Sequence, residues 1–102
     1  MPGDEPRELP ALSVRIRIPE DVLMRQVGDE LVLLNLRDES YYGLNAVGVR
    51  LMQLAETGTT LEDAANTLIT EFEVGREQLD ADIRRLAAEL LSAGLLERAA
   101  PP

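Results

Sequence analysis

Side chains capable of chemistry are few in this sequence. Acidic residues stand next to one another at four places, Glu20-Asp21, Asp29-Glu30, Asp38-Glu39 and Glu62-Asp63. Such pairs could bind a metal or act as an acid/base couple, but neighbouring side chains point apart on a strand or a helix. None of the pairs has the spacing of a calcium-binding loop. We therefore interpret them as residues of turns and of a helix start.

Catalytic groups of other kinds are also scarce. The chain contains no His and no Cys, which excludes an imidazole base, a thiolate nucleophile and the common zinc ligand sets. Its serines, Ser13, Ser40 and Ser92, lack the sequence of a nucleophile elbow and have no His to activate them. We expect no catalytic residue, no metal site, no cofactor and no enzymatic activity.

The charge of the chain limits its partners. Its 102 residues include 19 acidic and 10 basic side chains, a formal net charge of −9, and every basic residue is Arg. Nucleic acids and anionic membranes attract basic surfaces, so we expect neither as a partner. No apolar run is long enough to span a bilayer, and the proline-bearing acidic start is unlike a secretory signal. These features predict a cytoplasmic protein.

A basic pair late in the chain suggests an alternative function. Arg84-Arg85 is typical of the recognition helix in a DNA-binding helix-turn-helix protein. The same predicted helix carries acidic residues that would repel a duplex, so a solvated face or an acidic-peptide contact is favoured over DNA. These acidic residues are Glu77, Asp80, Asp82 and Glu89.

Alternating and continuous apolar segments predict strands in the first half of the chain. Residues 14–18 alternate between apolar side chains and Arg until Pro19 ends the run, which suits an edge or a lead-in segment. Two further apolar segments, 22–27 and 31–36, and the shorter 41–44 are separated by polar turns. The simplest interpretation is three short antiparallel strands.

Helical periodicity follows the strands. Asn45 can cap a first helix that ends near Gly58, and Thr60 can cap a second helix whose apolar face continues to Phe72. A third helix is predicted from about Glu77 to Ala93, with Gly94 placed to end it. The order β-β-β-α-α-α predicts an α+β domain over residues 13–98, between flexible ends at 1–12 and 99–102.

The tyrosine pair marks the most informative strand. Tyr41 and Tyr42 face opposite sides, so at most one of them can enter the core. The strand to Leu44 is the last before the helices, and it lacks the Lys, Pro or bulge signals that usually protect an edge. Unpaired N–H and C=O groups there could receive an extended peptide by strand addition, although ordinary β-propensity explains the pair as well.

These segments together resemble the PqqD-like family over residues 19–97. The resemblance rests on apolar positions and on the Leu44-Asn45 junction, in the segments Leu31–Leu36, Tyr41–Asn45, Leu51-Met52, Thr60–Asp63 and Leu90–Leu96. It implies a winged-helix-like domain that acts as a RiPP recognition element, which binds the leader of a ribosomally made precursor peptide and presents it to modifying enzymes.

The resemblance also implies a pathway and partners. A stand-alone chain of this size looks most like the leader-binding protein of lasso-peptide pathways, which works beside a separate leader peptidase and a macrolactam-forming synthetase. A peptide chaperone of pyrroloquinoline quinone synthesis or of another such pathway is the alternative. A winged-helix regulator that binds DNA or protein is the alternative of a different class.

By the same resemblance, the leader adds a strand beside residues 40–44 and lies against the third helix. We expect the N-terminal half of the helix stripe to stay open to the leader, and Tyr42 to border the same cleft. Arg84 or Arg85 could pair with a leader carboxylate at its rim. The expected peptide-binding residues are Ser40, Tyr41, Tyr42, Gly43, Leu44, Leu79, Asp82, Ile83, Arg85 and Leu86.

Overall fold

The hairpins predicted in the first half of the chain form a meander. The computed structural model describes residues 9–100. Strands β2 (Val22–Val27), β3 (Glu30–Asn35) and β4 (Ser40–Gly43) pair in the order β2-β3-β4, antiparallel throughout. Gly28 turns the first hairpin with a φ of 62° that favours glycine. The three-stranded sheet of the α+β prediction is therefore confirmed.

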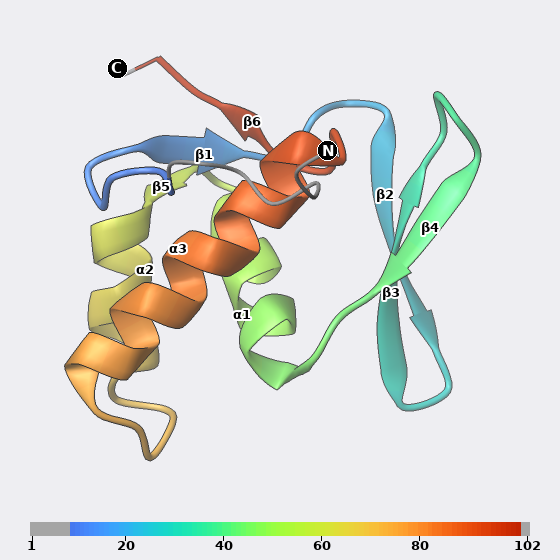
Figure 1. Ribbon diagram of the computed structural model, residues 1–102. Coiled ribbons are helices and arrows are strands. Elements are labelled where there is room, and N and C mark those ends of the chain that lie inside the picture. The colour runs from blue at the N-terminus through green and yellow to red at the C-terminus, as the bar shows by residue number, and fades with distance from the viewer. Residues whose placement is uncertain (1–8, 101–102) are drawn as a thin grey trace, which may run out of the picture.

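A second small sheet was not predicted. The lead-in segment forms β1 (Arg15–Arg17), which pairs with β5 (Thr59–Thr60) on one side and β6 (Glu97–Arg98) on the other. This sheet lies over the ends of the helices, away from β2–β4 (Figure 1). Strands of two residues are too short to show an alternating pattern, which is why the sequence did not reveal β5 and β6.

Three helices follow with the expected signals at their ends. Helix α1 (Ala46–Ala55) begins at Asn45, whose side chain accepts a hydrogen bond from the Gly48 N–H at 2.8 Å. Helix α2 (Leu61–Leu68) begins at Thr60, which accepts from the Asp63 N–H at 3.0 Å. Both predicted caps are confirmed.

The second helix is shorter than predicted. It ends at Leu68 instead of continuing to Phe72, because Thr70 turns back and donates to the Thr67 carbonyl from both its N–H and its hydroxyl. Phe72 still packs partly buried against the core from the following turn. Its periodic spacing was therefore a correct sign of burial but not of helix.

Helix α3 (Arg76–Ser92) ends in a Schellman motif. Gly94 adopts a φ of 74°, its N–H donates to the Leu91 carbonyl, and the Leu95 N–H donates to the Leu90 carbonyl at 2.8 Å. The chain then returns through β6, and the Ala99 N–H donates to the Arg15 carbonyl at 2.8 Å. The predicted stop at Gly94 is confirmed.

One core joins these elements. Leu33 of β3, Leu51 and Met52 of α1, Leu68 of α2 and Leu90 of α3 are among its fully buried members. Of the expected flexible ends, residues 1–8 and 101–102 lie outside the described part. Within the remainder, Pro10 is buried and Leu12 packs against the core, so the packed chain includes residues before 13.

Candidate functional site

Strand β4 forms one edge of its sheet. Its only hydrogen-bonded neighbour among residues 9–100 is β3, in a register that opposes Leu33 to Tyr42 and Val32 to Gly43. The Leu44 N–H donates to the Leu31 carbonyl, which fixes which residues point toward β3. Backbone groups alternate in direction along an antiparallel strand. The N–H and C=O groups of Tyr41 and Gly43 therefore face the free edge.

The hydrogen bonds on the other side of β3 give the same alternation. The Leu36 N–H donates to the Asp21 carbonyl at 2.8 Å, so even-numbered residues of β3 bond toward β2 and odd-numbered residues toward β4. Two independent bonds thus agree on the direction of the β4 backbone. The edge offers donors and acceptors at every second residue.

The side chains of β4 also alternate. Tyr42 and Leu44 are half-buried and pack against the core, whereas the Tyr41 side chain is 75% exposed. The expectation that at most one tyrosine enters the core is thereby confirmed. Gly43 is open on its outer side, where an added Cβ would meet no atom within 4 Å. The face of the sheet that carries the Tyr41 side chain is therefore open at Gly43.

Ser40 is held by the turn that starts β4. Its N–H and its hydroxyl both donate to Asp38 Oδ1, at 3.0 and 2.6 Å. These hydrogen bonds hold the pKa of the Asp38 carboxyl below its ordinary value of 3.8. Glu39 adopts a φ of 60°, the left-handed conformation that reverses the chain. Ser40 therefore fixes where the free edge begins.

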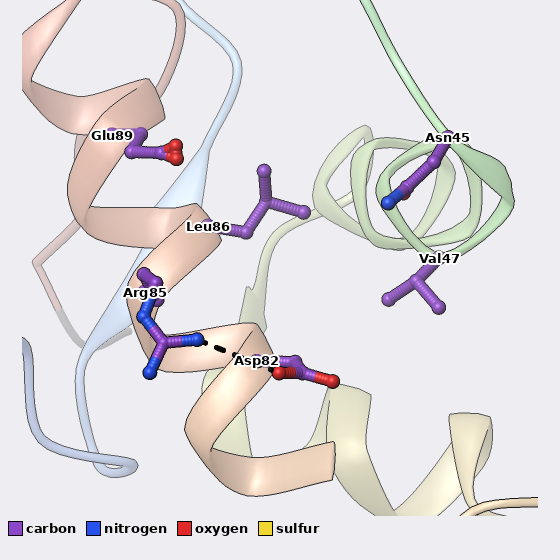
Figure 2. Close-up of a pocket in the computed structure, with 6 residues that line it drawn as sticks. All are labelled: Asn45, Val47, Asp82, Arg85, Leu86 and Glu89. Carbon is purple, nitrogen blue, oxygen red and sulfur yellow. Dashed lines mark ion pairs between the residues drawn. The ribbon is translucent and has the colours of Figure 1, made fainter. Parts of the chain in front are cut away.

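A groove opens between α1 and α3. Its volume is about 300 Å³, and its lining residues are Asn45, Val47, Asp82, Arg85, Leu86 and Glu89. Figure 2 shows Leu86 pointing from α3 toward α1, where Asn45 and Val47 lie. Asn45, which lines the groove, follows Gly43 at the end of β4 by only two residues.

The groove has an apolar floor and a charged rim. Leu86 and Val47 are half-buried and pack against the core. At the rim, Arg85 Nη1 lies 3.6 Å from Asp82 Oδ1, which also accepts from Gln78 Nε2 at 2.9 Å. The Arg85 side chain is 63% exposed, so this ion pair contributes little to stability and is free to exchange partners.

Asn35 connects the sheet to the end of α3. It is 4% exposed, one of the few buried polar side chains, and its Nδ2 donates to the Ala93 carbonyl at 3.4 Å. Its Oδ1 accepts from the Arg37 N–H at 3.0 Å. Because Asn35 is paired with Ser40 across the strands, this contact helps to set β4 relative to α3.

The structure places eight of the ten predicted site residues in two groups. Ser40, Tyr41, Tyr42, Gly43 and Leu44 lie on β4 and its end, and Asp82, Arg85 and Leu86 line the groove. The prediction was wrong that the N-terminal half of the helix stripe stays open. Leu79 and Ile83 are 1% and 0% exposed, because this stripe packs into the core.

Sequence reasoning missed Asn45, Val47 and Glu89 as groove residues. The sequence predicts Asn45 only as a helix cap, and Val47 falls inside the predicted first helix without a signal of a groove. On α3, Asp82, Leu86 and Glu89 follow one another at intervals of four and three residues, the spacing of one helical face. That face borders the buried stripe of Leu79 and Ile83, and the spacing of its residues was the signal in the sequence that could have predicted the groove.

No group of three or more acidic side chains within residues 9–100 is arranged to hold a metal ion. In the same part of the chain, no helix is both long and apolar enough to cross a membrane.

Comparisons with known proteins relate the chain to a family and to solved structures. No curated protein matches the chain. Two solved structures resemble it, "TbiB1 in Complex with the TbiA(beta) Leader Peptide" and "Lasso peptide synthetase B1 complexed with the leader peptide". The first is 34% identical, with a TM-score of 0.74 over 83% of this chain and 99% of the other. The second is 28% identical, with a TM-score of 0.67 over 84% and 98%.

A family match covers the same elements. Residues 30–96 match the family described as coenzyme PQQ synthesis protein D (PqqD). The matched segment runs from the start of β3 to the residue before β6, so it contains β4, α1 and α3, which together form the exposed edge and the groove. The chain therefore belongs to the PqqD family.

Proposed function

We infer that this chain is a RiPP recognition element that binds the leader of a precursor peptide by strand addition to β4. The observation that carries this proposal is the free edge at Tyr41 and Gly43, which is followed two residues later by Asn45 in the lining of a groove with an apolar floor. Both similar structures are complexes with a leader peptide, which supports the same class of ligand here. The similarity to a lasso peptide synthetase B1 favours a lasso-peptide pathway.

The two parts of the site have different tasks. Backbone pairing with β4 supplies affinity that depends little on the peptide sequence, while side-chain pockets supply specificity. Leu86 and Val47 offer an apolar surface to a leader side chain, and Arg85 can leave Asp82 to pair with a leader carboxylate. A leader with an apolar anchor and a nearby acidic residue is the ligand that this groove fits.

In this proposal the chain performs no chemistry of its own. It works in the cytoplasm with a separate leader peptidase and a macrolactam-forming synthetase. By holding the leader, it raises the effective concentration of the peptide at these enzymes and orients the part to be modified. The family description also fits pyrroloquinoline quinone synthesis, and the cognate peptide distinguishes the two pathways.

Hydrogen exchange tests the site. On addition of the leader, the amide protons of Tyr41 and Gly43 should exchange more slowly, because only these β4 amides gain a partner at the free edge. The Tyr42 amide, which already points toward β3, serves as an internal control, and a scrambled leader serves as the peptide control. Protection confined to α2, or protection equal for both peptides, would contradict the proposal.

A further inference from the structure

The sheet β2–β4 has a second free edge, at β2. Among residues 9–100, strand β2 hydrogen-bonds only to β3, and its six residues pair without a bulge. The Leu36 N–H donates to the Asp21 carbonyl, so the odd-numbered residues of β2 bond toward β3. The backbone N–H and C=O groups of Met24 and Gln26 therefore face away from the sheet. The described chain supplies no backbone partner for them.

The β2 edge lacks the features that usually prevent strand addition. Natural edge strands are short, bulged or interrupted by Lys or Pro. Strand β2 contains neither Lys nor Pro, and at six residues it is as long as β3 and longer than the other described strands. Its one charged residue, Arg25, opposes Val32 on the side of the sheet that faces away from the core. An extended peptide can therefore pair with this edge.

A hollow lies along the β2 edge. Its volume is about 300 Å³, and its lining residues are Ile18, Val22, Leu23, Met24 and Glu56. Val22 belongs to the core, and Ile18 and Met24 pack against it, so most of the lining is apolar. Glu56 is the one charged residue among these five. The hollow thus offers an apolar surface with a single carboxylate.

The residues around the β2 edge are acidic on balance. The charged residues of β2 and its flanking turns are Glu20, Asp21, Arg25, Asp29 and Glu30. Asp21 is paired with Arg37, and no other ion pair involves these residues within the described chain. A cationic partner is therefore favoured over an anionic one.

Glu56 gives the hollow its preference for a cation. It is exposed, has no ion pair within residues 9–100, and follows the last residue of α1, where the helix dipole also favours positive charge. Arg15 and Arg17 line an adjoining hollow with Glu56, but neither lines this one, and Arg17 is paired with Glu97. A Lys or Arg side chain fits the hollow, because its aliphatic stem can cover the apolar lining while its charged end meets Glu56.

We propose that the β2 edge binds an extended segment of another protein that carries Lys or Arg at alternate positions. In an antiparallel pairing, a residue opposite Met24 shares its side of the sheet and places a basic side chain at the hollow. The intervening residues lie beside Leu23 on the other side and are apolar. A second copy of this chain fits poorly, because it would bring a second acidic edge. The site is separate from the leader site, which uses the opposite edge, and does not rest on the proposed function.

A designed peptide tests the site. The probe is a short, terminally blocked peptide that alternates Val and Lys, titrated into the full chain labelled with ¹⁵N. The Met24 and Gln26 amides should shift and exchange more slowly, whereas the Leu23 and Arg25 amides, which already bond to β3, serve as internal controls. The same peptide with Glu in place of Lys should bind about tenfold more weakly or less. N-methylation of the Lys residues, whose N–H groups face β2 in this pairing, should abolish binding, and N-methylation of the Val residues should not.

Two variants with matched controls test the two parts of the site. Gln26→Pro removes an edge donor but no hydrogen bond to β3, and should weaken binding of the Val/Lys peptide by about tenfold. Gln26→Ala loses the same side-chain hydrogen bond to the Gly28 carbonyl but keeps the N–H, and should stay within about threefold. Glu56→Gln should weaken binding by about fivefold at low salt and less at high salt. Glu73→Gln, at an exposed position outside the site, should stay within about twofold.

Several results would overturn the proposal. These are an absence of amide shifts at Met24 and Gln26, equal affinity for the Lys and Glu peptides, and equal affinity of folded Gln26→Pro and Gln26→Ala chains. A mass in sedimentation that doubles with concentration, and that Gln26→Pro returns to the monomer, would assign the edge to a second copy and overturn the proposal equally.

Discussion

Replacing Gly43 by Pro tests the free edge most directly. The Gly43 N–H faces away from β3, so its loss removes no hydrogen bond within the sheet. Proline is tolerated on an edge strand where the missing N–H faces solvent. A Cβ at residue 43 also meets no atom within 4 Å. The fold should therefore survive with a thermal midpoint close to that of the wild type.

The cost to leader binding follows from the missing donor. A leader carbonyl that would accept from Gly43 is desolvated beside the strand and left without a partner, at about 1–3 kcal/mol. That penalty corresponds to a loss of about 5- to 150-fold in affinity. Fluorescence anisotropy with a labelled leader measures this change in Kd, and circular dichroism checks that the variant is folded.

A matched substitution isolates the N–H group. Gly43→Ala keeps the donor and adds a Cβ where nothing lies within 4 Å, so its Kd should stay within about threefold of the wild type. The reasoning is refuted if a folded Gly43→Pro chain binds the leader as tightly as Gly43→Ala. That result would mean that the leader does not pair with this edge.

Three further predictions follow from the groove, the sheet and the surface. Leu86→Ser should weaken leader binding by about tenfold in calorimetry, whereas Ile83→Ala, at a fully buried position, should lower the free energy of unfolding by about 2–4 kcal/mol in urea. Equal binding and stability losses for the two variants would contradict this division. Asn35→Ala removes buried hydrogen bonds and should lower the free energy of unfolding by about 1–3 kcal/mol in the same assay, and an unchanged midpoint would count against it. The Arg50 guanidinium donates hydrogen bonds of 2.8 and 2.9 Å to Glu71 and lowers the pKa of that carboxyl below 4.5. The contribution of this ion pair to the free energy of unfolding is therefore fully present above pH 4.5 and is lost as the pH falls through the folded-state pKa of Glu71. The difference in Tm between wild type and Glu71→Gln should shrink as the pH falls below 4.5. A difference that grows on acidification would contradict this prediction.

The elements that the sequence predicted well carry local signals. Apolar segments separated by polar turns defined the three strands of the main sheet, and Asn45, Thr60 and Gly94 marked helix ends through chemistry confined to a few residues. The predicted end of α2 was wrong because Phe72, an apolar residue at helical spacing, packs against the core from a turn that follows the helix. Periodicity reports which side of the chain is buried, not the backbone conformation that buries it.

The candidate site was predicted only in part for a related reason. A stripe such as Leu79 and Ile83 shows that one side of α3 is apolar, but not whether another element covers it. Coverage depends on α2 and the sheet, which are distant in sequence. The groove instead lies on the border of the stripe, at Leu86, where apolar and charged residues meet. The free edge was predictable because β4 is the last strand before the helices.

The alternation along β4 restricts the registers in which an added strand can pair with its edge. The backbone N–H and C=O groups that face the free edge belong to Tyr41 and Gly43, two residues apart, or about 6.7 Å along the strand. A peptide displaced by one residue turns every side chain to the opposite face, whereas a displacement of two restores both the pairing and the facing. For a leader that pairs with this edge as proposed, the register can therefore change only in steps of two residues if the same side chains are to face the core.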